Sequence, residues 1–191
     1  MSLTVEKYLQ AWTNSLKQMN AKADIVFFGD SLTYYGDFAT VFPNRVVCNL
    51  GLRGDCIQGM IDRVELLKLL EPKVVFIMAG INDVATCTLD VFKKKYAELL
   101  RQVKNILPKS DLICQTMLPV NNEDFSISCN NSQIIACNAE IISLVKFYNL
   151  RFIDLFTIYE RDGKLQKNMT VDGIHLKPKA YENWFIELKK I

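Results

Sequence analysis

Short runs of β-branched and aromatic residues alternate with stretches of helical periodicity along this chain, and that alternation leaves few folds open. Near-continuous apolar runs of this length are typical of strands buried on both faces of a parallel sheet. The pattern predicts an α/β fold, a three-layer α/β/α sandwich with a five-stranded parallel sheet and right-handed crossovers. The expected strands are Asp24–Phe28, Arg45–Cys48, Lys73–Met78, Asp111–Thr116 and Leu150–Asp154.

Apolar residues at helical spacing are expected to form the faces with which helices cover this sheet. We interpret these stripes as core faces and not as ligand-binding surfaces. Thr88 is a suitable N-cap for the third stripe, and Pro178 suits the first turn of the last. The stripes are Val5, Leu9, Trp12, Leu16 and Met19; Ile57, Met60, Ile61, Val64 and Leu67; Phe92, Tyr96, Leu99, Val103 and Ile106; Ile134, Cys137, Ile141, Val145 and Tyr148; and Ala180, Trp184 and Leu188.

Length and composition favour one globular domain over residues 1–191, because 50% of the residues are hydrophobic. The net charge is +2 without a long charged block, so neither nucleic acid nor an anionic membrane is an expected partner. The longest apolar run, Val74–Ile81, is too short to span a bilayer. The N-terminus does not resemble a signal peptide, which favours a cytoplasmic protein, although removal of a signal would leave the same pattern.

Histidine occurs only once, at His175. This count excludes mechanisms that need two histidines, such as that of an H-E-x-x-H metalloprotease. The six cysteines form no C-x-x-C pair, so no metal site is expected. Several cysteines lie in apolar runs, where a free thiol behaves as a small hydrophobe, but their even number leaves disulfides open.

Small, polar and reactive residues follow the expected strands, at the edge where open parallel sheets bind ligands. They lie in Gly29–Thr33, Asn49–Asp55, Gly80–Asp83 and Asp172–His175. The polar segment Asn121–Asn131 is expected to form a loop at the same edge.

Ser31 is a candidate nucleophile because it follows a buried strand and could open a helix. A serine needs a base, and His175 is the only histidine available. Asp172 lies three residues before His175, a spacing that can place its carboxylate against the ring Nδ1–H and present Nε2 to Ser31. Taken singly, these residues could equally be a helix cap, a structural histidine and a chance D-x-x-H spacing.

Acyl transfer also requires donors for the developing oxyanion. Gly54 could offer a backbone N–H, and Asn82 could offer its side-chain amide. A tight turn and an Asx-turn are the structural alternatives for these two residues, and Gly51 is the alternative to Gly54. One suitable residue at each of four predicted strand ends is nevertheless hard to obtain by chance.

At these residues the sequence resembles the SGNH hydrolases, the GDSL-type esterase and lipase superfamily. Gly29-Asp30-Ser31-Leu32 matches the nucleophile block, and the final D-x-x-H block matches Asp172 and His175. Gly54 and Asn82 match the glycine and asparagine of the two intervening blocks. The resemblance implies a flavodoxin-like sandwich, a cofactor-free mechanism and an oxyanion hole that also includes the Ser31 N–H.

The resulting expectation is a serine esterase that cleaves small, short-chain carboxylic esters, including O-acetyl groups on carbohydrates. Tyr34, Tyr35 and Val84 are candidates for the substrate pocket because they lie close to the motifs. Alternatives are an acyl-thioesterase or lysophospholipase-type lipid hydrolase that uses the same site, and a non-catalytic binding module on a flavodoxin-like fold. A homodimer is left open.

Overall fold

A computed structural model describes residues 3–191, with side chains described from residue 10 onward. Its main sheet has five parallel strands in the order β2-β1-β3-β4-β5. This is the flavodoxin-like order, and it confirms the predicted α/β fold and parallel sheet. The strands are β1 (Ile25–Gly29), β2 (Val47–Gly51), β3 (Val74–Met78), β4 (Asp111–Gln115) and β5 (Arg151–Ile153).

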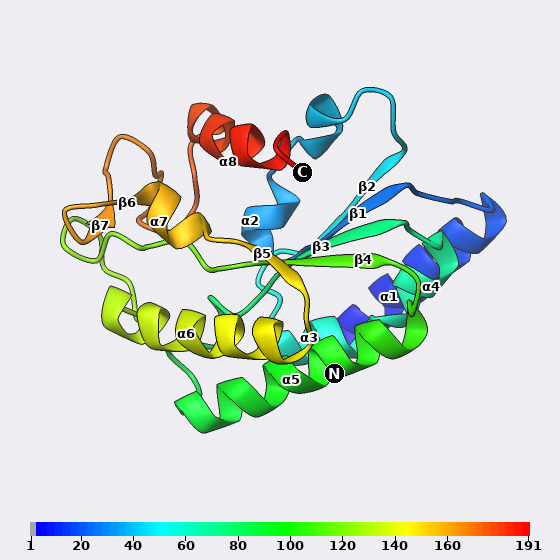
Figure 1. Ribbon diagram of the computed structural model, residues 1–191, viewed down its shortest axis with the longest axis horizontal. Helices are drawn as coiled ribbons and strands as arrows, with labels where there is room; N and C mark the ends of the chain where they lie inside the picture. The colour runs from blue at the N-terminus through cyan, green and yellow to red at the C-terminus, as the bar shows by residue number, and fades with distance from the viewer. Residues whose placement is uncertain (1–2) are drawn as a thin grey trace.

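Helices cover both faces of the sheet and complete the three layers (Figure 1). A two-stranded hairpin, β6 (Glu160–Arg161) with β7 (Lys164–Leu165), lies outside the main sheet. The helices on one face are α1 (Leu3–Gln18), α3 (Ile57–Asp62), α4 (Glu65–Leu70), α5 (Leu89–Ile106) and α6 (Asn131–Phe147). Those on the other are α2 (Ser31–Tyr34), the 3₁₀ turns η1 (Phe38–Val41) and η2 (Pro178–Ala180), α7 (Leu155–Tyr159) and α8 (Tyr181–Leu188).

The central strand β1 contributes to the core on both faces of the sheet, and all five of its residues are buried. Phe28 belongs to the core cluster under α5 and α6. Phe27 points to the opposite face, where its ring stacks on Phe76 at 4.6 Å and on Phe38 at 3.8 Å between centroids. Because both faces of β1 are packed, the loop that follows Gly29 starts from a rigid position.

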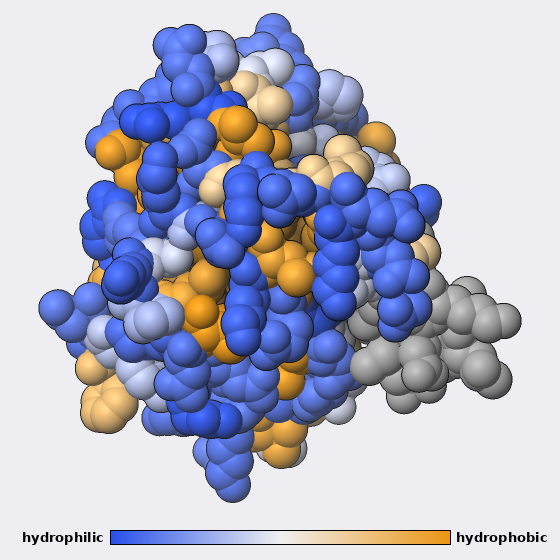
Figure 2. Space-filling model, turned by 90° about the vertical axis from the view of Figure 1, so that its right-hand side faces the viewer, coloured by the Kyte–Doolittle hydropathy of each residue, from blue (hydrophilic) through white to orange (hydrophobic). Residues whose placement is uncertain are grey.

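The carboxyl end of β1 is the point at which the strand order reverses. Gly29 is paired with Gly51 of β2 on one side and with Met78 of β3 on the other. Ligands of open α/β sheets bind in the crevice at such a point. At the opposite end, where the strands begin, hydrophilic side chains surround an apolar hollow (Figure 2), and Lys73 and Asp24 form an ion pair at 2.8 Å.

The predicted stripe from Ile57 to Leu67 forms two short helices instead of one. The chain turns at Arg63, whose amide N–H donates to the carbonyl of Met60 three residues earlier, and α3 ends there. By contrast, Thr88 caps α5 as predicted, because its hydroxyl accepts a hydrogen bond from the Val91 amide.

The first predicted stripe is correct only in part. Trp12 and Leu16 pack against the core, whereas Met19 is exposed. Met19 lies beyond the end of α1, where the chain reverses at Asn20 with a φ of 45°. The side chains of Val5 and Leu9 lie outside the described residues.

The segment from Asn121 to Asn130 is a loop, as predicted, and Asn130 caps α6 in a capping box with Gln133. None of the helices formed by residues 3–191 combines the length and the apolar character that a bilayer crossing requires.

Candidate active site

Ser31 is the first residue of α2, directly beyond the carboxyl end of β1. Asp30 caps this helix, since its Oδ1 accepts a hydrogen bond from the Leu32 amide at 2.9 Å. Gly29 permits the turn, because a Cβ at this position would lie 2.2 Å from the Thr33 hydroxyl oxygen and 2.7 Å from the Met78 carbonyl oxygen. The sequence therefore places the Ser31 hydroxyl at the end of a buried strand, where 6% of the residue is exposed.

The structure brings Ser31, His175 and Asp172 into one hydrogen-bonded chain. Ser31 Oγ lies 2.8 Å from His175 Nε2, although the two residues are 144 positions apart. His175 Nδ1 lies 2.6 Å from Asp172 Oδ2 on the opposite side of the ring. This is the arrangement that the D-x-x-H spacing predicted, with Nε2 facing the serine.

A tight turn holds the Asp172 carboxylate in this position. Its Oδ1 accepts hydrogen bonds from the amides of Ile174 at 3.0 Å and His175 at 2.8 Å. Partial burial raises the pKa of Asp172, but the hydrogen bonds from the His175 ring and from these amides outweigh it, and the pKa lies below its ordinary value. Asp172 is therefore ionised at neutral pH and can stabilise a positive charge on His175.

Gly54 and Asn82 lie on neighbouring loops, after β2 and β3 respectively. The Asn82 Nδ2 donates to the carbonyl of Asp55 at 2.8 Å, and this bond joins the two loops. An amide nitrogen carries two hydrogens, so a second N–H of Asn82 is available for a ligand. Gly54 has a φ of +72° and open space where a Cβ would lie.

The alternative residue Gly51 has a different role. It is the last residue of β2, and a Cβ there would lie 2.2 Å from the backbone nitrogen of Tyr34. Gly51 thus permits α2 to pack closely on β2, whereas Gly54 lies on the exposed part of the loop. The geometry favours Gly54 as the candidate donor.

Arg63 is a residue of this region that sequence reasoning missed. Its buried guanidinium donates to Asp55 Oδ2 at 2.7 Å, to the Gly29 carbonyl at 2.8 Å and to the Leu50 carbonyl at 2.7 Å. One side chain therefore ties together the end of the nucleophile strand, the end of β2 and the loop that carries Gly54. One sequence feature could have indicated that Arg63 is buried: it lies three residues after Met60, on the buried side of a helical stripe.

The charges of this buried pair influence each other. Burial raises the pKa of Asp55 and lowers that of Arg63, and the attraction between the two opposite charges opposes both changes. The side chains of Arg63 and Asp55 are 1% and 6% exposed, so neither charge is solvated by bulk water. The charge of Asp55 and the charge of Arg63 therefore compensate each other inside the protein.

Asp30 carries a strongly raised pKa. Burial, and to a smaller extent the charge of nearby Asp55, raise this pKa to about 7, while the hydrogen bond from the Leu32 amide opposes the change. The unfolded chain loses this proton near its ordinary pKa, whereas the native protein retains it until about pH 7. The free energy of unfolding is therefore expected to fall as pH rises between these two values.

An Asp30→Asn variant is expected to be more stable than the wild type at about pH 8, by up to about 4 kcal/mol. Asparagine can still accept from the Leu32 amide but cannot ionise, so the burial of a charge is avoided. The difference should disappear below about pH 3, where the wild-type carboxyl is protonated in both states. Urea unfolding curves at several pH values measure it. Equal stabilities at about pH 8 would contradict the assignment of a penalty to Asp30 ionisation.

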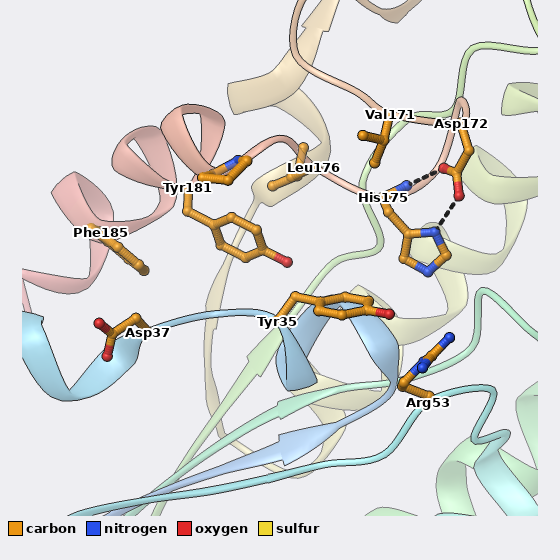
Figure 3. A pocket seen from close by; sticks show the side chains of 10 residues that line it. Tyr35, Asp37, Arg53, Val171, Asp172, His175, Leu176, Tyr181 and Phe185 are labelled. Carbon is orange, nitrogen blue, oxygen red and sulfur yellow. Dashed lines mark hydrogen bonds and ion pairs between the residues drawn. The ribbon is translucent and has the colours of Figure 1, made fainter.

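A cleft of about 480 Å³ opens beside His175 (Figure 3). Tyr35 forms part of its wall and makes an edge contact with the His175 ring, with centroids 5.7 Å apart. The other wall is contributed by Tyr181 and Phe185 of α8, which the sequence did not indicate as pocket residues. Leu176 and Pro178 extend the apolar lining.

Of the three predicted pocket residues, only Tyr35 lines this cleft. Tyr34 is exposed and contacts Tyr35 edge-on, but it is not part of the lining. Val84 is 4% exposed, belongs to the hydrophobic core and does not line this cleft. Proximity in sequence to the asparagine motif did not predict the direction of this side chain, because the turn after β3 points it inward.

Residues 10–191 contain no group of three or more histidine, cysteine, aspartate or glutamate side chains placed to hold a metal ion. All six cysteines, which lie between Cys48 and Cys137, are free thiols.

Comparison with known proteins assigns the family. Residues 27–182 match the sequence profile of the GDSL-like lipase/acylhydrolase family. This match spans most of the chain and includes Ser31, Gly54, Asn82, Asp172 and His175. The protein belongs to the GDSL-like lipase/acylhydrolase family, and it is accordingly a carboxylic ester hydrolase. A search of the curated proteins finds no match.

Solved structures share the fold at low sequence identity. A Streptococcus pneumonia protein named after platelet activating factor is 21% identical, with a TM-score of 0.83 over 97% of this chain and 93% of that one. A GDSL-like lipase from Bacteroides thetaiotaomicron is 21% identical, with a TM-score of 0.78 over 95% of both chains. A lipase/acylhydrolase from Enterococcus faecalis is 20% identical, with a TM-score of 0.71 over 87% of this chain and 95% of that one.

Proposed function

We propose that this protein is a serine esterase that cleaves short-chain carboxylic esters through an acyl-enzyme on Ser31. The observation that carries the proposal is the hydrogen-bonded chain from Ser31 Oγ to His175 Nε2 at 2.8 Å and from His175 Nδ1 to Asp172 at 2.6 Å. A hydroxyl held by an imidazole, whose second nitrogen is held by a carboxylate, can lose its proton as it attacks a carbonyl carbon.

In the first half-reaction, His175 Nε2 accepts the Ser31 proton while Oγ forms a bond to the ester carbonyl carbon. Asp172 stabilises the resulting imidazolium and keeps its own charge. The N–H groups of Ser31 and Gly54 and the Asn82 amide hold the negative oxygen of the tetrahedral intermediate. The C–O bond to the alcohol then breaks, and His175 gives the proton to the leaving oxygen.

In the second half-reaction, a water molecule attacks the acyl-enzyme while His175 Nε2 accepts one of its protons. The bond between the acyl carbon and Ser31 Oγ breaks, His175 returns the proton to Oγ, and the carboxylic acid leaves. The same donors hold the oxyanion in both steps, so one site performs the complete cycle.

For the substrate we propose esters with short acyl groups, including O-acetyl groups on carbohydrates. The aromatic faces of Tyr35, Tyr181 and Phe185 support this proposal, since they offer flat apolar walls beside a partly open cleft. Acyl-thioesters and lysophospholipids would use the same catalytic residues. Turnover of acetyl, butyryl and octanoyl esters, acetylated sugars and an acyl-CoA distinguishes these classes.

A fluorophosphonate probe tests the serine mechanism, because it reacts with an activated serine and stays covalently attached. We expect mass spectrometry to find the label on Ser31 of the wild-type protein. His175→Gln should lose rapid labelling, since no second histidine can replace the base. Heat-denatured protein serves as the control for unspecific reaction. Labelling of His175→Gln at the wild-type rate, or at a residue other than Ser31, would refute the mechanism.

A further inference from the structure

Arg53 lies at the catalytic end of the cleft. It follows β2 and directly precedes Gly54, the proposed oxyanion donor. Its guanidinium carbon lies 5.7 Å from the centroid of the Tyr35 ring, and Tyr35 in turn contacts His175. Figure 3 shows Arg53, Tyr35 and His175 at the same end of the cleft, and His175 Nε2 lies 2.8 Å from Ser31 Oγ, so the guanidinium lies at the end of the cleft that holds the catalytic histidine.

Within the part of the chain whose side chains are described, no carboxylate forms an ion pair with Arg53. Three of the other five arginines do have such partners, which compensate their charges. These pairs are Arg63 with Asp55, Arg101 with Glu98 and Arg151 with Asp111. Arg53 instead combines an exposed charge with a defined position over an aromatic ring.

The two carboxylates that line the cleft do not neutralise Arg53. Asp172 is held by the His175 ring and by two backbone amides. Asp37 lies at the far end of the cleft beside Phe185, separated from Arg53 by the aromatic side chains (Figure 3). Apart from Asp172, whose carboxylate is bound to His175, the cleft therefore presents a cation next to the reacting groups and an anion, Asp37, away from them.

A guanidinium is permanently charged and presents a planar array of N–H donors that matches the two oxygens of a carboxylate or phosphate. The contact with Tyr35 limits the conformations of the side chain before a ligand arrives, which lowers the entropy lost on binding. We propose that Arg53 binds an anionic group, a carboxylate or a phosphate, that the ester substrate carries near its scissile bond. Arg53 is thus a specificity-determining residue, and this inference rests on the esterase function proposed above.

The anion can belong to the acyl part or to the alcohol part of the ester, and two matched pairs of substrates distinguish these sources. The acyl pair is para-nitrophenyl butyrate and mono-para-nitrophenyl succinate, which have acyl chains of equal length. The alcohol pair is the methyl ester of para-acetoxybenzoate and para-acetoxybenzoate itself. For each pair, the ratio of kcat/KM for the anionic ester to that for the neutral ester measures charge selectivity.

Arg53→Gln is expected to lower this ratio by about five- to tenfold in at least one pair, mainly through a higher KM for the anionic ester. Arg53→Lys should retain part of the selectivity because it keeps the charge without the planar donors. Higher ionic strength should reduce the wild-type ratio but not that of Arg53→Gln.

Arg45→Gln is the matched control, since it removes the same charge from an exposed arginine just before β2, at the opposite end of the sheet. Its ratio should equal that of the wild type. Ratios unaffected by Arg53→Gln in both pairs, or lowered equally by Arg45→Gln, would overturn the inference while leaving the esterase intact. A wild-type protein that hydrolyses neither member of either pair would overturn the proposed function together with it.

Discussion

Replacing Ser31 by alanine is expected to lower kcat/KM for para-nitrophenyl acetate by about 10⁴-fold or more. The variant removes the only atom that can form the acyl-enzyme. His175 and Asp172 keep their mutual hydrogen bond, but they have no nucleophile to activate. The fold should be unaffected, because the backbone hydrogen bonds of α2 do not involve the hydroxyl and alanine favours a helix.

Ser126→Ala is a suitable control for this experiment. Ser126 is an exposed serine in the loop Asn121–Asn130 and lies outside the lining of the cleft. We expect it to have wild-type turnover, and we expect both variants to unfold at the wild-type urea concentration. Residual Ser31→Ala activity near that of the wild type would rule out Ser31 as the nucleophile.

Replacing Arg63 by methionine is expected to reduce the free energy of unfolding by about 3–5 kcal/mol. Methionine can fill much of the same volume, but it leaves the buried Asp55 carboxylate without its partner. The carbonyls of Gly29 and Leu50 also lose their hydrogen-bond donor. Urea unfolding at about pH 8 measures the effect, because at this pH an unpaired Asp55 must either stay charged in the core or bind a proton from a solution that holds few.

Combining Arg63→Met with Asp55→Asn separates the unpaired charge from the lost packing. The double variant should be more stable than Arg63→Met alone, because no buried carboxylate remains without compensation. Its kcat should still be below that of the wild type, since the loop that carries Gly54 has lost its connection to β1. A loss below about 1 kcal/mol in Arg63→Met, or a double variant less stable than the single one, would contradict this account.

The sheet could be predicted from sequence because its strands are encoded locally. A run such as Val74–Met78 is apolar on both faces of the extended chain, which suits only a strand covered on both sides. Helix boundaries were less predictable. The break between α3 and α4 lies at Arg63, whose side chain donates hydrogen bonds to carbonyls of β1 and β2. The periodicity of one segment does not reveal such partners from other segments.

Candidate chemistry was also visible in the sequence, because the residue types are few. A single histidine, preceded three residues earlier by an aspartate, left little choice of base once Ser31 followed a buried strand. The substrate cleft was not visible in the same way. Tyr181 and Phe185 come from the last helix, and Val84 points into the core despite its place beside the asparagine motif.

The sequence by itself determined the α/β/α layering and the five strands, which follow from local patterns of polarity and spacing, and it indicated the candidate reactive residues through their motifs. Only the tertiary structure decided that Ser31 Oγ meets His175 Nε2 at 2.8 Å across 144 positions of sequence. It alone also decided that Arg63 is buried in an ion pair while Arg53 faces the cleft. These two arginines carry the same charge and lie in the same region of the sequence. Folding gives them different partners, and these partners distinguish the structural role of Arg63 from the role in substrate recognition that we propose for Arg53.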